Sequence, residues 1–270
     1  MELTIYRYLF KPKVDKQNLF YEHASQYVKQ HKNTVFREAI LKCRFIHRNR
    51  ELSKQIVYDR DNIIVLKLAN KKSIIREKNF EEEKLLNEPS IHVIIHNNPH
   101  IQKIAIEQKV TAFSETDTVK NIIKRSINQF LLEHQTLIDI RQTYQEVEFW
   151  NIVNRHKNKI TYICFEFDYP NLPSAFTKAT EMLKSLSQSV NSKSNKLALE
   201  AAKNETLIIG KNNVQIQELN AASSQMGNTT TIRVKGIKKQ IKTGQTIETI
   251  TYDDVEITGS NISEIIKMIE

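Results

Sequence analysis

A run of basic side chains close to the start of the sequence has the composition of a phosphate-binding surface. Between positions 29 and 54 there are eight Lys or Arg against two acids, and the densest part contains Lys42, Arg44, Phe45, Arg48 and Arg50. Guanidinium groups grip phosphate oxygens in pairs and stack on bases, and an aromatic ring among them adds a stacking surface. If this part is one strand, Lys42, Arg44, Arg48 and Arg50 share a face and form a basic stripe. An exposed edge strand that uses charge to prevent aggregation would carry the same pattern.

A second basic group lies in the C-terminal segment IRVKGIKKQIKTG. Its members are Arg233, Lys235, Lys238, Lys239 and Lys242. Gly236 and Gly244 permit tight turns in this segment, and the tip of such a hairpin could enter a nucleic-acid groove as a β-ribbon. A solvated hairpin without a ligand explains the same residues. Basic residues on the polar side of the segment 114–133, namely Lys120, Lys124 and Arg125, are expected to form a solvated face.

The nearest approach to a catalytic centre is Glu107 with Lys109. Two residues that are two apart on a strand project from one face, as in metal-dependent nucleases that hold Mg²⁺ and polarise the attacking water. That chemistry also needs an Asp from a preceding strand, and no Asp occurs between Asp61 and Asp117. An ordinary surface Glu and Lys are therefore the expectation, and a small nuclease is an alternative.

Three histidines, His92, His96 and His100, have spacings that suggest metal ligands. On a strand, however, His92 and His96 stand about 13 Å apart, which is too far to share a zinc ion. His96 and His100 could face each other across a hairpin loop and, beside Lys103, act as the acid and base of an RNase. Because no third ligand lies nearby in the sequence, we expect neither a metal nor another cofactor.

The order of segments over residues 55–260 resembles a family of uncharacterised proteins from bacterial phage-defence regions. The resemblance rests on IHVIIHNNPHIQKIAIEQ, INQFLLEH, TLIDIRQ, EFWNIVNRH followed by KITYICFEF, and KLALEAAKNETLIIG. The arrangement is also distantly similar to the DNA-binding component of the lambda Rex phage-exclusion system. The resemblance implies a prokaryotic accessory defence protein that contacts DNA, and it carries no site residue across.

Composition supports and limits these hypotheses. The net charge of +9 favours a polyanion partner. Lys outnumbers Arg 29 to 11, however, and there are 35 Ile, a bias that AT-rich coding DNA also produces, so clustering of the charges must decide. There are five glycines and none before position 210, which excludes a Walker loop, a dinucleotide-binding fingerprint and a G-x-S-x-G elbow.

The cysteines and apolar runs indicate the compartment. Cys43 and Cys164 lie far apart and suit reduced thiols in the cytosol better than a disulfide scaffold. The apolar runs are too short to span a bilayer, and the N-terminal sequence MELTIYRYLFKPK has no signal-peptide pattern. We expect a cytoplasmic protein with no membrane partner.

Hydrophobic periodicity predicts the helices and strands that carry these residues. The first part gives a strand at 1–10, a helix at 16–30, a helix or strand at 34–45, a hairpin at 55–68, and a connector or short helix at 70–89. The second part gives a hairpin at 91–107, strands at 137–141, 160–167, 197–201 and 206–209, helices at 114–133, 146–155, 174–190 and 214–226, a hairpin at 230–257 and a helix at 262–269. These elements predict an α+β fold with mixed, mostly antiparallel sheets and packed helices, for which ferredoxin-like units are the suggested arrangement. We expect a basic N-terminal α+β domain over 1–88 and a C-terminal α+β domain over 89–270.

Three hypotheses for function follow. The first is a nucleic-acid-binding protein, more readily of DNA than of RNA, that uses mainly phosphate contacts and need not be an enzyme. The second is a small nuclease or toxin effector. The third is a scaffold subunit that binds a second defence protein or another copy of itself as a homodimer.

Overall fold

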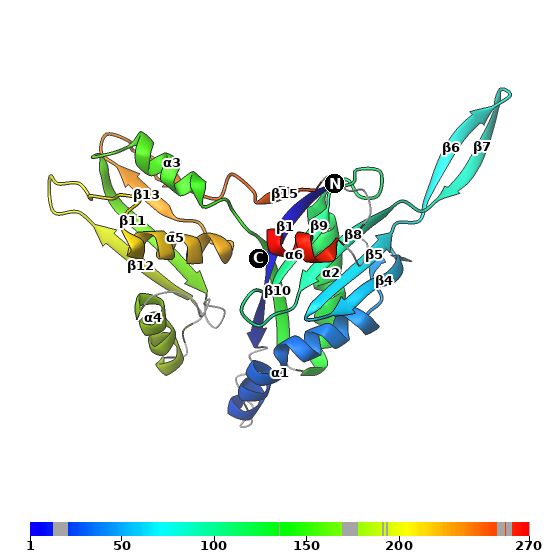
Figure 1. Ribbon diagram of the computed structural model, residues 1–270, viewed down its shortest axis with the longest axis horizontal. Helices are drawn as coiled ribbons and strands as arrows, with labels where there is room; N and C mark the ends of the chain where they lie inside the picture. Colours follow the sequence, from blue (N-terminus) through cyan, green and yellow to red (C-terminus); the bar gives the residue numbers. More distant parts are fainter. Residues whose placement is uncertain are drawn as a thin grey trace. The chain divides into compact units, whose positions relative to one another are not determined.

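The computed structural model describes residues 1–12, 21–134, 136–168, 178–190, 192, 194–252, 257 and 261–269. The chain forms two compact units, one of Met1–Ile140 with Thr249–Glu270 and one of Arg141–Glu248. Each combines helices with an antiparallel sheet, so the predicted α+β class is confirmed (Figure 1).

The first unit is built on a seven-stranded sheet. Six strands follow the order β10-β1-β9-β8-β5-β4, and β15 pairs with β1 beside them. Antiparallel registers join β1 to β9 and β15, β9 to β8, β8 to β5 and β5 to β4. The strands are β1 (Glu2–Pro12), β4 (Ser53–Arg60), β5 (Ile63–Ala69), β8 (Ser90–His96), β9 (Lys103–Glu107), β10 (Thr136–Gln142) and β15 (Thr249–Thr251).

Helices pack on both faces of this sheet because its strands alternate apolar residues on each side. Tyr6, Tyr8 and Phe10 of β1 belong to the core shared with α1 (Tyr21–Lys42) and α2 (Thr116–Leu131). Leu3 and Ile5 of the same strand belong to the core under α6 (Ile262–Ile269). A 3₁₀ turn, Leu132–His134, follows α2.

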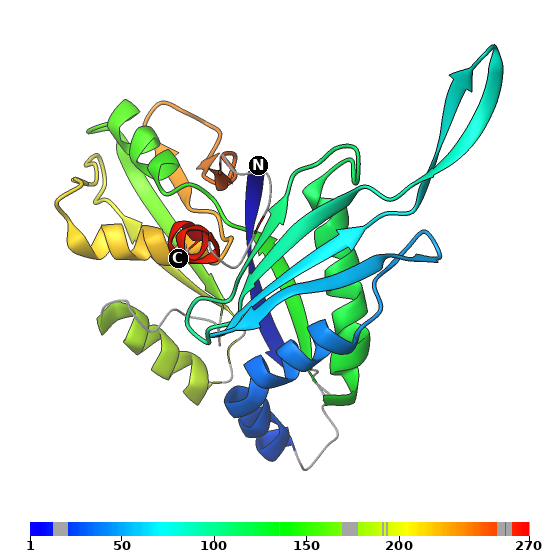
Figure 2. The same ribbon diagram turned by 45° about the vertical axis from the view of Figure 1, so that its right-hand side comes forward.

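One hairpin of the first unit stands outside the sheet. Strands β6 (Lys72–Lys78) and β7 (Glu81–Asn87) pair with each other along their whole length, and both views show the ribbon projecting from its unit (Figures 1 and 2). The prediction of a connector or short helix over 70–89 is therefore wrong. Every residue of the two strands is exposed or half-buried, so no alternation of buried residues marks them as strands, and a two-residue turn at Asn79 and Phe80 reverses the chain.

The second unit has a four-stranded sheet in the order β12-β11-β13-β14. Its elements are α3 (Val147–Arg155), β11 (Ile160–Asp168), α4 (Lys178–Ser189), β12 (Ser194–Glu200), α5 (Val214–Gln225), β13 (Thr231–Val234) and β14 (Ile241–Lys242). Phe149 and Trp150 of α3 pack with Phe165 and Phe167 of β11 in a separate core. Because β11 and β12 are neighbours, this sheet lacks the strand that splits the βαβ unit in a ferredoxin-like fold, so the suggested ferredoxin-like arrangement is not the one observed.

The predicted domain boundary near Pro89 differs from the division in the structure. β8 pairs with β5 from Ser90 to His96, and β9 pairs with β1, so a cut at this position would divide one sheet. The division lies instead at Ile140/Arg141 and again at Glu248/Thr249. The predicted hairpin over 230–257 is divided in the same way, because β13 pairs with β14 whereas β15 returns to β1.

Candidate nucleic-acid interface

The basic segment after α1 is a tight hairpin. Lys42 ends the helix, and two short strands follow, β2 (Ile46–His47) and β3 (Arg50–Glu51). Arg48 and Asn49 form the turn with φ values of 47° and 62°, the pair of positive angles that suits a two-residue hairpin loop. The prediction of one strand with four basic residues on a single face is wrong, because the chain reverses at Arg48.

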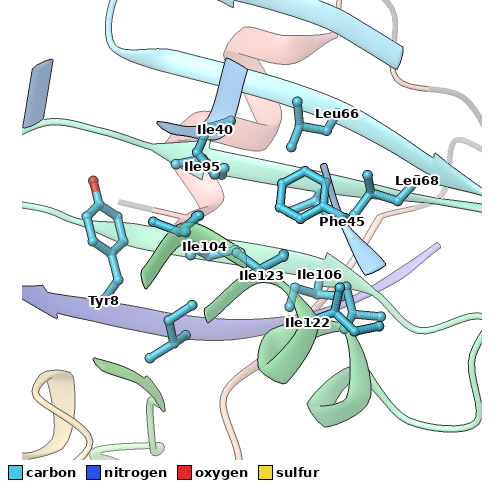
Figure 3. Packing of buried hydrophobic residues seen from close by; sticks show 14 of the residues in the cluster. Tyr8, Ile40, Phe45, Leu66, Leu68, Ile95, Ile104, Ile106, Ile122 and Ile123 are labelled. Carbon is cyan, nitrogen blue, oxygen red and sulfur yellow. The ribbon is translucent and has the colours of Figure 1, made fainter. Parts of the chain in front are cut away.

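Phe45 does not face solvent. Its side chain is 1% exposed and packs in the core near Leu66 and Leu68 (Figure 3). The backbone N–H of Leu52 donates to the Phe45 carbonyl at 2.8 Å, so the hairpin is closed directly above this buried ring. The expectation that Phe45 stacks on a base is therefore wrong, and the ring anchors the hairpin instead.

Lys54 holds the end of α1. Its ammonium donates to the carbonyls of Ile40, Leu41 and Cys43 at 3.2, 2.8 and 2.7 Å. A cation at a helix C-terminus satisfies the last carbonyls and complements the helix dipole. Burial lowers the pKa of Lys54. This residue of the basic run thus joins the start of β4 to the end of α1.

Cations from three segments meet at the hairpin. Arg125 of α2 donates through Nη2 to the carbonyl of Ile46 at 2.5 Å, and Lys72 of β6 donates to the carbonyl of Thr111 at 2.7 Å. The pKa of His47 is lowered, first by its partial burial and then by the charges of Arg48, Arg125 and Lys72. Arg50 lies directly opposite His47 across the two strands. We call His47, Arg48, Arg50, Lys72 and Arg125 the His47 cluster.

The basic residues of this region differ in their ionic partners. Lys42 forms an ion pair with Glu38, and Arg44 lies 3.8 Å from Glu51, both pairs on the surface. Arg48 and Arg50 are exposed, and within the described ranges neither forms an ion pair with a carboxylate. Surface pairs contribute little energy, so Lys42 and Arg44 are also accessible to an external anion.

A shallow depression of about 540 Å³ adjoins the cluster on α2. Its lining residues are Asn121, Lys124, Arg125, Asn128, Gln129 and Leu132. Lys124 contacts Asp139 at 2.6 Å, and the amide of Asn128 bonds to both backbone groups of Ile138. Sequence reasoning did not join Arg125 to the hairpin, although the spacing of 121, 124, 125 and 128 indicated one polar helix face.

The second basic group lies in the other unit, around the β13–β14 hairpin. Arg233 faces Tyr162 of β11, with its guanidinium carbon 4.3 Å from the ring centroid. Gly236, at φ +85°, allows the turn after Lys235. Lys235, Lys238, Lys239 and Lys242 are exposed, as the sequence predicted for a solvated hairpin and as phosphate contact would also require.

Glu107 is placed differently from a nuclease carboxylate. β9 ends at Glu107, so Lys109 lies beyond the strand. Burial would raise the pKa of Glu107, but the hydrogen bonds from His92 outweigh it and the pKa is lowered. Glu107 Oε2 lies 2.7 Å from His92 Nδ1 and 2.8 Å from its backbone nitrogen, and both side chains are nearly buried. This pair is not accessible to a nucleic-acid substrate.

His96 and His100 do not form an exposed catalytic pair either. His96 and Lys103 are buried, and the ammonium of Lys103 donates to the carbonyl of Ile269 at 2.7 Å. His100 lies in the turn between β8 and β9 and is exposed. In the part of the chain that the structure describes, no group of three His, Cys, Asp or Glu side chains is arranged to hold a metal ion.

Three features concern the whole chain. Cys43 and Cys164 are free thiols. Among the described helices, none combines the length and apolar character needed to cross a membrane. No protein-family model, curated protein or solved structure matches the chain.

Proposed function

We propose that this chain binds nucleic acid through phosphate contacts of the His47 cluster, without catalysing a reaction. The observation that carries the proposal is the convergence of Arg48, Lys72 and Arg125 from three separate segments around one hairpin turn. Repulsion between neighbouring cations destabilises the free protein. A bound anion relieves this repulsion, so the cluster favours anion binding. Displacement of condensed counterions from the phosphates then drives association.

The geometry favours binding with little sequence preference. Arg48 lies in a two-residue turn and Arg50 lies directly after it, a position that suits contacts to phosphates. Base edges are instead read by an element that enters a groove, such as a helix. Arg233, Lys235, Lys238, Lys239 and Lys242 supply a second contact on the other unit. Non-specific complexes of this kind depend strongly on salt.

The biological setting in this proposal rests on the sequence resemblance. Similarity to proteins of phage-defence regions and to a DNA-binding phage-exclusion component favours DNA over RNA. It also favours a cytoplasmic accessory protein of a prokaryotic anti-phage or mobile-element system, in which a second defence protein would be a further partner.

The experiment compares two triple variants of the full chain on a short DNA duplex. Arg48→Ala with Arg50→Ala and Arg125→Ala should weaken binding by at least tenfold and reduce the salt slope of log K by roughly 2 to 3, because about 0.9 is lost per phosphate contact. Lys157→Ala with Lys203→Ala and Lys211→Ala removes equal charge at exposed sites elsewhere and is the control. An equal loss of affinity in both variants would mean that binding depends only on net charge. Unchanged affinity in the Arg48, Arg50 and Arg125 variant would refute the proposed site.

A further inference from the structure

The β6–β7 ribbon extends away from the sheet of its unit, and Lys72 at its base donates to the Thr111 carbonyl. Its seven residue pairs lie outside the sheet, and none of its residues is buried. Large apolar side chains are exposed on it: Phe80 is 98% exposed, Leu86 89% and Ile75 68%. A lone two-stranded hairpin is only marginally stable in water, and apolar side chains that face solvent add no burial energy to it.

The residue at the tip of the ribbon is unusual for its conformation. Asn79 and Phe80 form the turn with φ values of 55° and 68°. This turn type strongly favours Asn followed by Gly, and a bulky residue at positive φ is strained. The chain therefore places an aromatic ring, fully exposed, where glycine would stabilise the ribbon. A contact outside the ribbon explains this choice.

The distal half of the ribbon is acidic. From Glu77 to Glu83 there are four carboxylates and one lysine, and Arg76 forms an ion pair with Glu83 at 2.8 Å. Glu77 stands directly opposite Glu82, and like charges in that position destabilise a strand pair. Ile75 and Leu86 lie on the same face as these two glutamates. The tip thus combines an exposed ring with carboxylates that are suited to a cationic, partly apolar surface.

We propose that the ribbon docks on a second copy of this chain, with Phe80 in the depression on α2 and the glutamates of the tip against the His47 cluster. The charges are complementary, since the chain as a whole carries +9 while the ribbon tip is acidic. The depression supplies apolar surface through Leu132, which is 42% exposed, beside Lys124 and Arg125. Ile46, also 42% exposed, adds apolar surface at the hairpin.

The reach of the ribbon favours a second copy over a contact within one chain. Seven residues of strand extend about 23 Å. Lys72 begins the ribbon and belongs to the His47 cluster, so the tip of a rigid ribbon stands far from the cluster of its own chain. In a closed, two-fold dimer, the ribbon tip of each copy contacts the His47 cluster of the other copy.

The first test measures the mass of the nucleic-acid-free full chain by sedimentation velocity at several concentrations and salt levels. We expect a dimer of the 31.6-kDa chain that dissociates as salt rises. Phe80→Gly suits the positive φ and should leave the fold intact, yet weaken the dimer at least tenfold. Asn79→Gly, in the same turn, is the matched control and should leave the dimer unchanged.

The second test exchanges charges. Glu77→Lys with Glu82→Lys reverses the tip, and Arg48→Glu with Arg125→Glu reverses the cluster, so each variant alone should be monomeric. An equimolar mixture should form a heterodimer, because each ribbon then meets a cluster of opposite charge. A purely structural effect of either substitution would not be rescued by mixing.

Three outcomes overturn the proposal: a monomer at every concentration in low salt, a dimer that Phe80→Gly leaves intact, and a mixture of reversed variants that does not associate. Because the protein is free of nucleic acid in both tests, a failure here leaves the proposed DNA binding standing. Loss of DNA binding alone would likewise leave the dimer standing.

Discussion

Residues of the same basic run have different structural roles. Phe45 anchors the hairpin in the core and Lys54 joins β4 to the end of α1, whereas Arg48 and Arg50 face solvent. The sequence identified the arginines as candidate phosphate ligands. It could not identify the turn, because Arg48 and Asn49 bring no Gly or Pro, nor could it place Lys72 and Arg125, whose approach depends on tertiary structure.

His47 makes the cluster sensitive to pH. Partial burial and then the neighbouring cations lower its pKa from about 6.5, so in the free protein the proton is bound only below that value. A bound phosphate reverses the local field and favours the protonated ring. Binding of a DNA duplex should therefore tighten as pH falls through about 6.5 and below.

The measurement is duplex affinity against pH at constant salt for the native chain and for His47→Gln, which keeps hydrogen-bonding capacity without titrating. The native chain should gain several-fold in affinity, and the variant should respond much less. Parallel pH profiles for the two proteins would mean that His47 does not take part in binding.

Among the helices and strands, hydrophobic periodicity predicted correctly those elements that bury one face. The hairpins at 55–68 and 91–107 and the helix at 114–133 correspond to β4–β5, β8–β9 and α2. It failed for β6–β7, because both faces of that ribbon are solvated and no apolar alternation marks it. The helix or strand predicted at 34–45 is largely the second half of α1.

Asp139 joins three elements of the first unit. Its carboxylate contacts Lys11 of β1 at 2.7 Å and Lys124 of α2 at 2.6 Å, while its own strand is β10. Burial would raise the pKa of Asp139, but the two lysines hold it well below its usual range. Its folded-state pKa is thus below the unfolded value, so the stabilisation is present above about 3.9 and is lost as pH falls below that.

Asp139→Asn should accordingly lower the free energy of unfolding at neutral pH by about 1 to 2 kcal/mol, a figure reduced because both lysines are partly exposed. Urea denaturation at pH 7 and at successively lower pH would show the difference between native and variant chains narrowing in acid. A constant difference at every pH would indicate a packing defect rather than loss of the two ion pairs.

At the scale of the whole molecule, the sequence predicted the fold class but not the division into units. The first unit is closed by β15 and α6 from the far end of the chain, which pack on β1. Pairing between segments some 250 residues apart leaves no local pattern, so the order of predicted strands and helices indicated a boundary near Pro89 that differs from the observed division. The two basic groups lie in different units, as they also did under the predicted boundary.

In the proposed complex, the His47 cluster itself contacts nucleic acid. The most direct measurement is NMR of the Nε–H groups of the eleven arginines during titration of the full chain with a short DNA duplex. We expect the largest chemical-shift changes at Arg48, Arg50 and Arg125, decreasing together as salt rises, and no change at Arg37, because Arg37 already pairs with Asp59. Shifts confined to Arg233, or none at saturating duplex, would contradict it.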